Sequence, residues 1–189
     1  MVVNHKAAEA AVRDLLVALG EDPDREGLRG TPDRVARAFA ELLAGREADL
    51  SKILQVDFGS NGYDEMVALR GVGFWSLCEH HLLPFYGTAA VVYIPGESKR
   101  VVGLSKLARL VDTYARRLQI QERMTGEIAD ALRENLSPRG WGVLLRAKHL
   151  CMCARGVQKD GAEMVTSVVG GLIKEDTRSR DEFLRLAGL

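Results

Sequence analysis

The sequence predicts an α+β fold in which an antiparallel sheet carries two packed helices and is preceded by N-terminal helices. Segments rich in β-forming residues predict strands at 66–75 and 88–95. Segments of helical period then predict helices at 103–118 and 121–136, and two further strands are expected at 143–154 and 163–173. Strands grouped in pairs, rather than alternating one by one with helices, favour antiparallel pairing. The chain has 189 residues, enough for one sizeable core and a small helical appendage.

Two helices are expected before this core. Residues 5–19 place apolar side chains along one helical stripe. A second helix begins at "TPDRVAR", for which we expect Thr31 as the N-cap and Pro32 in the first turn. The polar segment "SNGYDE" then separates the helices from the rest of the chain. We therefore expect an N-terminal helical region, 1–60, and an α+β catalytic domain, 61–189.

Each element of the core rests on its own pattern. "MVALRGVGFW" and "TAAVVYIP" are rich in the β-branched and aromatic residues that strands favour. The two central helices place large apolar residues on one face, namely Leu107, Leu110, Val111 and Tyr114, then Met124, Ile128 and Leu132. "SPRGWG" is a turn, "VLLRAKHLCMCA" and "EMVTSVVGGLI" are the last two strands, and "TRSRDEFLRLAG" is a closing helix.

The composition excludes several classes of function. Lys plus Arg and Asp plus Glu both number 26, so net charge gives no reason to expect binding to nucleic acid or to a membrane surface. No apolar run approaches the roughly 18 residues of a membrane span, and the N-terminal residues lack the apolar core of a signal peptide. Three cysteines do not form a disulfide framework. We expect a cytoplasmic protein whose thiols are free to bind metal.

The segment "SLCEHHLLPFYG" contains the first candidate metal ligands. Thiolate and imidazole are preferred zinc ligands, and a catalytic zinc site needs three protein ligands with a fourth position open. Cys78 and His81 lie three apart, so in a tight turn they face the same way while His80 points elsewhere. Glu79 has no role beyond that of a turn carboxylate supporting a neighbouring group. The alternative is a buried cysteine beside surface histidines.

The third ligand is expected from "KHLCMCARG". If this segment is an extended strand, alternate residues share a face, and His149, Cys151, Cys153 and Arg155 line up. Spacing alone does not choose between the two cysteines as the third ligand. The alternative is that both are small buried core residues. Three of the four histidines and all three cysteines fall in these two segments, which favours the metal site.

Such a site would suit hydrolysis. A zinc ion held by two thiolates and one imidazole lowers the pKa of a water molecule enough to support hydrolysis near neutral pH. His80 and His149, outside the ligand set, are then available to donate and accept protons. The zinc nucleobase deaminases are excluded, because this chain has neither H-x-E nor P-C-x-x-C. A structural site with four protein ligands stays open, with Cys153 as the fourth.

The helices carry candidate substrate-binding residues. We expect Ser105 to cap the helix "SKLARLV", with Lys106 and Arg109 on one side, a combination suited to phosphate. Glu122 lies in the first turn of the next helix, and one carboxylate can accept the two parallel hydrogen bonds that guanine offers at N1–H and its 2-amino group. The alternatives are a capped helix with solvated cations and a carboxylate that favours the helix dipole.

Five segments together resemble the GTP cyclohydrolase I family: "TPDRVAR", "CEHHLLPF", "GLSKLAR", "RRLQIQER" and "HLCMCARGV". The resemblance is collinear from about Glu21 to the C-terminus. It implies the tunnelling fold (T-fold), a homodecamer of two stacked pentamers, and active sites between subunits. It also implies a zinc-dependent conversion of GTP into 7,8-dihydroneopterin triphosphate and formate, the first step of tetrahydrofolate and pterin biosynthesis, without a redox cofactor.

The resemblance also implies roles for individual residues. The zinc ligands match Cys78, His81 and Cys151, which settles the choice against Cys153. The catalytic residues match His80, His149 and Ser105, the last of them near the ribose. The guanine contacts match Glu122 and Gln121. The triphosphate contacts match Lys106, Arg109, Arg155, Arg34 and Arg37.

Some positions depart from the family pattern. Ala162 and Met164 stand where Ser or Thr is usual, Leu118 stands where proline is common, and Trp75 is unusually bulky before the motif. None of them is a matched ligand or catalytic residue. Two other readings stay open. One is a tunnelling-fold relative acting on another purine or pterin, against which the intact Cys-His-Cys set argues; the other is a non-catalytic, zinc-stabilised interaction protein.

Overall fold

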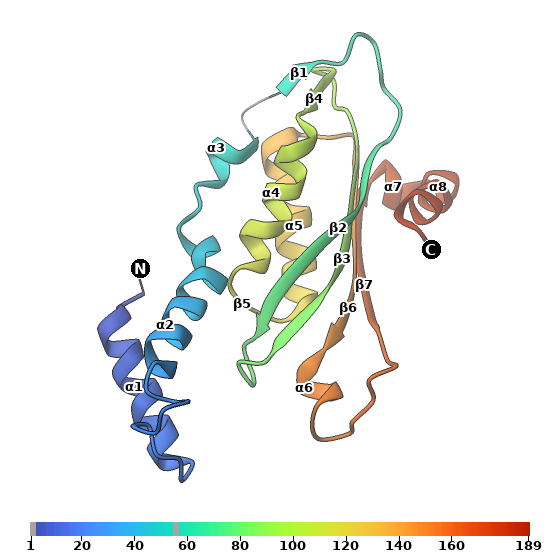
Figure 1. Ribbon diagram of the computed structural model, residues 1–189. Coiled ribbons are helices and arrows are strands. Elements are labelled where there is room, and N and C mark those ends of the chain that lie inside the picture. Colours follow the sequence, from blue (N-terminus) through green and yellow to red (C-terminus); the bar gives the residue numbers. More distant parts are fainter. Residues whose placement is uncertain (1–2, 55–56) are drawn as a thin grey trace.

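The computed structural model describes residues 3–54 and 57–189, and a five-stranded sheet lies at its centre (Figure 1). The strand order is β5-β2-β3-β6-β7. The four long strands, which pair antiparallel, are β2 (Val67–Cys78), β3 (Pro84–Ile94), β6 (Gly140–His149) and β7 (Met164–Gly171). The short strand β5 (Leu118–Gln119) pairs parallel with β2. The α+β class and the mostly antiparallel pairing expected from the sequence are confirmed.

Helices α4 (Leu104–Ala115) and α5 (Gln121–Leu136) cover one face of this sheet (Figure 1). The residues that the helical period places on their inner faces are buried, with Leu107, Leu110, Met124, Ile128 and Leu132 at 0% exposure. They pack in one cluster with apolar residues of β2, β3 and β6. The removal of this apolar surface from water is the main source of stability for the sheet and its two helices.

Two C-terminal helices, α7 (Leu172–Glu175) and α8 (Thr177–Ala187), lie on the opposite face (Figure 1). Phe183 of α8 is fully buried in a second apolar cluster that includes Val92 of β3. Gly142 of β6 makes room for this ring, since a Cβ there would lie 2.5 Å from a ring carbon of Phe183. The closing helix expected from the sequence is confirmed, and it covers part of the sheet face that α4 and α5 leave open.

The N-terminal helices α1 (His5–Ala18) and α2 (Thr31–Leu42) pack against each other beside the sheet (Figure 1). His5 Nε2 and Asp33 Oδ1 join them at 3.0 Å. Three short elements follow: η1 (Ala44–Glu47), α3 (Leu50–Leu54) and β1 (Asp57–Gly59). β1 pairs with β4 (Arg100–Val102), so the two expected regions are joined by a small sheet. Their division near residue 60 stays a prediction.

The N-cap of α2 lies one residue before the expected one, and that of α4 lies two residues before it. Gly30 and Gly103 are the N-caps, so Thr31 and Ser105 are not caps and lie in the first turn. Neither cap makes a side-chain hydrogen bond, because glycine has no side chain to offer one. Pro32 lies in the first turn of α2 as expected, where its missing N–H costs no hydrogen bond.

The predicted strand over 143–154 is wrong in its last five residues. β6 ends at His149, and Leu150–Cys153 form a short helix, α6. The change comes where β3 offers β6 no further partner in the sheet. Cys151 and Cys153 therefore lie in a helix and do not alternate along a strand, so the expectation that both share one strand face is wrong.

Candidate metal centre

The turn between β2 and β3 positions the first two candidate ligands. Cys78 is the last residue of β2, and its backbone N–H donates to Leu83 O at 2.9 Å. Leu82 takes the left-handed conformation, with φ 55°, and its N–H donates to Cys78 O at 2.8 Å. This tight turn brings His81 Nδ1 to 4.0 Å from Cys78 Sγ. The prediction that these two residues face the same way is confirmed.

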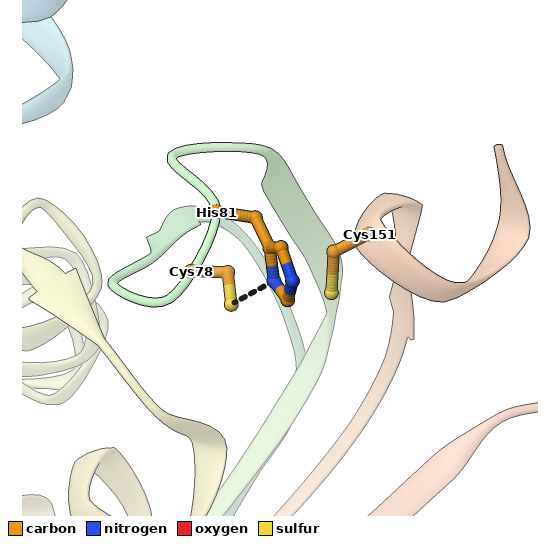
Figure 2. A group of neighbouring side chains, drawn as sticks. All are labelled: Cys78, His81 and Cys151. Atoms are coloured by element: carbon orange, nitrogen blue, oxygen red, sulfur yellow. Dashed lines mark hydrogen bonds between the residues drawn. The ribbon is translucent and has the colours of Figure 1, made fainter. Parts of the chain in front are cut away.

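Cys151 approaches the same point from the end of β6. It lies in the first turn of α6, and its side chain converges with those of Cys78 and His81 (Figure 2). The ligand atoms of the three residues all lie within 4.8 Å of one another. Cys153 is directed elsewhere, since its Sγ donates to Lys159 O at 3.6 Å. The structure thus gathers the three residues that the resemblance implies as ligands.

These three side chains fit a zinc ion. Bonds of about 2.3 Å to sulfur and 2.0 Å to nitrogen at tetrahedral angles place ligand atoms about 3.5–3.8 Å apart, so the cluster needs only a small contraction. Burial and the neighbouring Cys78 raise the pKa of the Cys151 thiol, because two thiolates this close repel each other. A divalent cation between them would relieve that repulsion. Three protein ligands also leave one position open, as catalytic zinc sites do.

His149 precedes Cys151 by two positions and is held on two sides. Its ring stacks on Phe85, with centroids 4.6 Å apart and planes 3° apart. Its Nε2 lies 2.8 Å from Gln121 Oε1. Burial lowers the pKa of His149, and the charge of Glu122 opposes part of that shift. The neutral imidazole is therefore the favoured form of His149, as a proton acceptor at neutral pH requires.

His80 and His81 are adjacent but differently directed. Their rings stand at 89° to each other, with centroids 6.3 Å apart. Both rings are exposed, but only His81 belongs to the Cys-His-Cys cluster. This matches the expectation that only one of the two faces the metal. His80 is accessible to a molecule that approaches the centre from solvent.

Sequence reasoning missed the partner of Glu79. Arg123 of α5 donates from Nη2 to Glu79 Oε2 at 2.5 Å and from Nε to Gln119 Oε1 at 3.0 Å. The hydrogen bond from Arg123 lowers the pKa of the Glu79 carboxyl. The backbone N–H of Glu79 also donates to Gln119 O at 3.0 Å. The turn that carries Cys78 and His81 is thereby tied to the start of α5.

Two predicted substrate contacts lie at this end of the molecule. Glu122 is exposed in the first turn of α5 and acts electrostatically on His149. Arg155 follows α6, where its Nη1 lies 3.3 Å from His81 Nε2 and donates to Cys151 O at 3.2 Å. An exposed carboxylate and an exposed guanidinium therefore accompany the candidate metal centre.

Three other predicted contacts lie on α4, away from this end. Ser105 and Lys106 occupy its first turn, whereas its last turn leads into β5, which pairs with β2 at Cys78 (Figure 1). A helix of 12 residues is about 18 Å long. Arg109 lies one turn beyond Lys106. One chain therefore does not bring Ser105 or Lys106 to its own Cys-His-Cys cluster.

Arg34 and Arg37 lie on α2 and are engaged locally. Arg37 pairs with Asp33 at 2.8 Å, and Arg34 Nη2 donates to Thr31 Oγ1 at 3.0 Å. Within residues 3–54 and 57–189, neither arginine contacts the Cys-His-Cys cluster. Their role in triphosphate binding stays a prediction.

The fold and the site define an α+β protein with three side chains, Cys78, His81 and Cys151, that could hold a metal ion. Comparison of sequences gives the particular family. The profile of the family described as GTP cyclohydrolase I matches residues 8–188, which is nearly the whole chain. The chain belongs to the GTP cyclohydrolase I family, and its tunnelling fold, expected from the resemblance, is confirmed.

Curated relatives named GTP cyclohydrolase 1 share most of the chain. That of Mycolicibacterium vanbaalenii is 56% identical over 179 residues, covering 95% of this chain and 88% of the relative. That of Corynebacterium aurimucosum is 53% identical over 97% of this chain and 93% of the relative. That of Mycobacterium tuberculosis H37Rv is 52% identical over 98% and 91%. A solved structure of the archaeosine synthase QueF-Like in the apo form aligns with 58% of this chain and 96% of its own, with TM-score 0.47 and 17% identity.

Proposed function

We propose that this chain converts GTP into 7,8-dihydroneopterin triphosphate and formate at a zinc centre held by Cys78, His81 and Cys151. The observation that carries the proposal is the convergence of these three ligands beside further imidazoles, in a chain at least 52% identical to proteins named GTP cyclohydrolase 1. The reaction is the first step of tetrahydrofolate and pterin biosynthesis.

The chain's own residues divide the chemistry among them. Zinc, when bound, supplies Lewis acidity and lowers the pKa of a water molecule. His149 and His80 move protons to and from the imidazole ring of the base as that ring opens and formate leaves. Overall the reaction adds one water to GTP and splits off formate, so electrons balance without a redox cofactor. His149 is half-buried and its pKa is lowered by burial, so the neutral ring suits the acceptor role.

Recognition of the base is assigned to Glu122. Its carboxylate is exposed and lies in the first turn of α5, at the same end as the metal ligands. One carboxylate accepts two parallel hydrogen bonds from guanine N1–H and the 2-amino group, which adenine lacks in that arrangement. Arg155, held beside His81, supplies positive charge for the phosphates.

We propose that the phosphate site is completed by another copy of the chain, in a homodecamer of two pentamers. The distance along α4 supports this, because Ser105 and Lys106 lie about a helix length from the end that meets the metal ligands. A second copy that presented its Ser105, Lys106 and Arg109 to the centre of the first would complete the site. Arg34 and Arg37 of α2 would join them.

A cytoplasmic location is proposed on chemical grounds. All three cysteines are free thiols, as zinc ligands in a reducing compartment must be. None of the helices within 3–54 and 57–189 combines the length and the apolar character that a bilayer crossing requires. Equal numbers of acidic and basic residues give no support for a nucleic-acid partner.

The proposal is tested by measuring metal and product on one sample. We expect about one zinc per chain, formate release from GTP, and a fluorescent pterin after oxidation of the product. His80→Ala should keep zinc and lose turnover, because His80 is not a ligand. A fully zinc-loaded protein that releases no formate from GTP would rule the proposal out.

The structural-zinc alternative has a separate test. It needs a fourth protein ligand, and Cys153 is directed to Lys159 O rather than to the cluster. X-ray absorption at the zinc edge counts the sulfur ligands. Two sulfurs support the catalytic centre, whereas three would favour a closed structural site.

A further inference from the structure

Gln121, the first residue of α5, has a fully buried side chain at 0% exposure. Its Nε2 donates to two backbone carbonyls, Leu145 O at 3.2 Å and Met164 O at 3.0 Å, and to Thr166 Oγ1 at 3.1 Å. Its Oε1 lies 2.8 Å from His149 Nε2. Both polar atoms of the side chain thus have partners inside the protein, and in the described chain the buried side chain has no surface exposed to a bound guanine.

The two carbonyls determine which way the amide faces. A carbonyl oxygen only accepts hydrogen bonds, so the amide NH2 must point toward Leu145 O and Met164 O. The opposite orientation would set three oxygens against one another and leave buried groups without hydrogen bonds, which folded proteins avoid. Oε1 is therefore the atom that faces His149. The contact to Met164 uses its backbone, so the departure from the family pattern at this position does not alter it.

An accepting oxygen at this distance requires a proton on His149 Nε2. In a neutral imidazole one nitrogen carries the proton and the other has a free lone pair. We propose that Gln121 is a positioning residue that holds His149 in the Nε2–H tautomer, so that Nδ1 is the nitrogen that exchanges protons with the substrate. Only the identity of that substrate rests on the proposed function; the tautomer does not.

The proton balance of this arrangement is simple. Nδ1 takes a proton from the reacting water or base, and the ring becomes a cation with an N–H at both nitrogens. Gln121 Oε1 keeps its hydrogen bond to Nε2–H and favours that cation. Return of the proton from Nδ1 to a nitrogen of the opening ring restores the neutral tautomer.

Stacking on Phe85 of β3 fixes the plane of the His149 ring, and contacts of α5 with β6 and β7 fix the amide that reaches it. Phe85 is fully buried, pairs with His149 across β3 and β6, and stacks on its ring. Thr125 donates to Gln121 O at 2.7 Å, and its hydroxyl lies 2.7 Å from Thr166 Oγ1. The start of α5 is thereby locked to β6 and β7, and the amide that reaches His149 has one orientation.

The tautomer is testable in the wild-type protein without an activity measurement. Zinc-loaded protein labelled with ¹⁵N at histidine is examined by magic-angle-spinning NMR at about pH 8.5, about two units above the ordinary imidazole pKa. The chain has four histidines, and the His149→Ala variant assigns the signal. We expect Nε2 protonated and Nδ1 unprotonated. A neutral His149 with its proton on Nδ1 would overturn the proposal.

Two variants separate positioning from packing. Gln121→Met fills the same space but offers His149 no acceptor, so the signal should divide between tautomers and kcat should fall about 100-fold or more. KM should stay within about threefold, because no substrate contact is lost. Thr166→Val is the matched control. It removes the hydroxyl that contacts Gln121 Nε2 at 3.1 Å and Thr125 Oγ1 at 2.7 Å. It leaves both carbonyls that orient Gln121, so the tautomer should persist and kcat should stay within about threefold.

Each outcome has a defined meaning. Unchanged kcat in Gln121→Met would overturn the proposal, as would a raised KM with unchanged kcat, which would make Gln121 a substrate contact. If thermal unfolding shows that Gln121→Met does not fold, the ¹⁵N measurement on the wild-type protein decides alone, and a neutral His149 with its proton on Nδ1 overturns the proposal. Wild-type protein with the expected tautomer but no formate release would overturn the proposed function and leave the tautomer standing.

Discussion

The two ends of the α4–α5 pair differ in how completely one chain builds them. At the end next to β5, segments from β2, α5, β6 and α6 converge on the Cys-His-Cys cluster, and residues of α5 hold both His149 and Glu79. At the other end, Ser105 is exposed and Lys106 is partly exposed in the first turn of α4, far from that cluster. The difference teaches that one chain by itself brings the candidate metal ligands together, and it is the basis of our proposal that phosphate recognition depends on how chains assemble.

Removal of a metal ligand should have the largest effect. Cys78→Ala or Cys151→Ala should lose zinc and lower turnover at least about 1,000-fold, because two ligands do not hold the ion. Cys153→Ala is the matched control, since the thiol of Cys153 contacts Lys159 O outside the cluster. This variant should keep both its zinc and its turnover. Zinc analysis and formate release are measured on the same samples. Zinc retained in Cys151→Ala, or lost in Cys153→Ala, would contradict the ligand assignment.

A substitution in the first turn of α4 should weaken GTP binding rather than zinc binding. Lys106→Ala should keep its zinc but bind GTP about 10- to 100-fold more weakly, because one cation is lost from the phosphate contacts. Co-expressed Cys78→Ala and Lys106→Ala chains should recover about a quarter of the wild-type kcat/KM if each site takes its zinc ligands from one chain and its Lys106 from another. Mixed oligomers without any recovery would show that a single chain supplies both ends.

Two of the three candidate ligands at the end of the α4–α5 pair next to β5, called the metal end below, were predicted from spacing alone. Cys78 and His81 belong to one short turn, so their spacing alone places them together. Cys151 could not be chosen over Cys153 from residues alone, because the choice depends on where β6 loses its partner and the chain becomes helical. Only the family resemblance made that choice. The approach of Cys151 to Cys78 and His81 depends on tertiary contacts, which local sequence patterns do not encode.

Other elements escaped prediction for equally physical reasons. The buried faces of α4 and α5 follow from apolar period, which is a strong signal over twelve or more residues. β1, β4 and β5 have only two or three residues and produce no period. The N-caps Gly30 and Gly103 offer no side-chain signal. Arg123 and Glu79 are 44 residues apart, so only the folded chain reveals their pairing.

The ion pair between Glu79 and Arg123 should have a moderate effect on the metal end. Glu79→Gln or Arg123→Gln should lower kcat/KM about three- to tenfold, because the turn of the zinc ligands is then less firmly tied to α5. The double variant should lose little more than either single one, since both remove the same contact. Arg133→Gln is the control: its pairing with Asp130, at 3.1 Å, lies near the other end of α5. Strictly additive losses would show that the pair does not act as a unit.

The sheet face opposite α4 and α5 should have the smallest effect on turnover. Phe183→Ala removes a fully buried ring from the cluster under α8, and should lower the free energy of unfolding by about 3–5 kcal/mol. It should change kcat less than about twofold, because that cluster does not include the residues that hold the metal ligands. Denaturant unfolding at fixed protein concentration measures the first effect, and Leu184→Ala, a partly buried neighbour, should give a smaller loss. Loss of zinc from folded Phe183→Ala protein would show that the two faces are coupled, and the independence of the metal end would then be disproved.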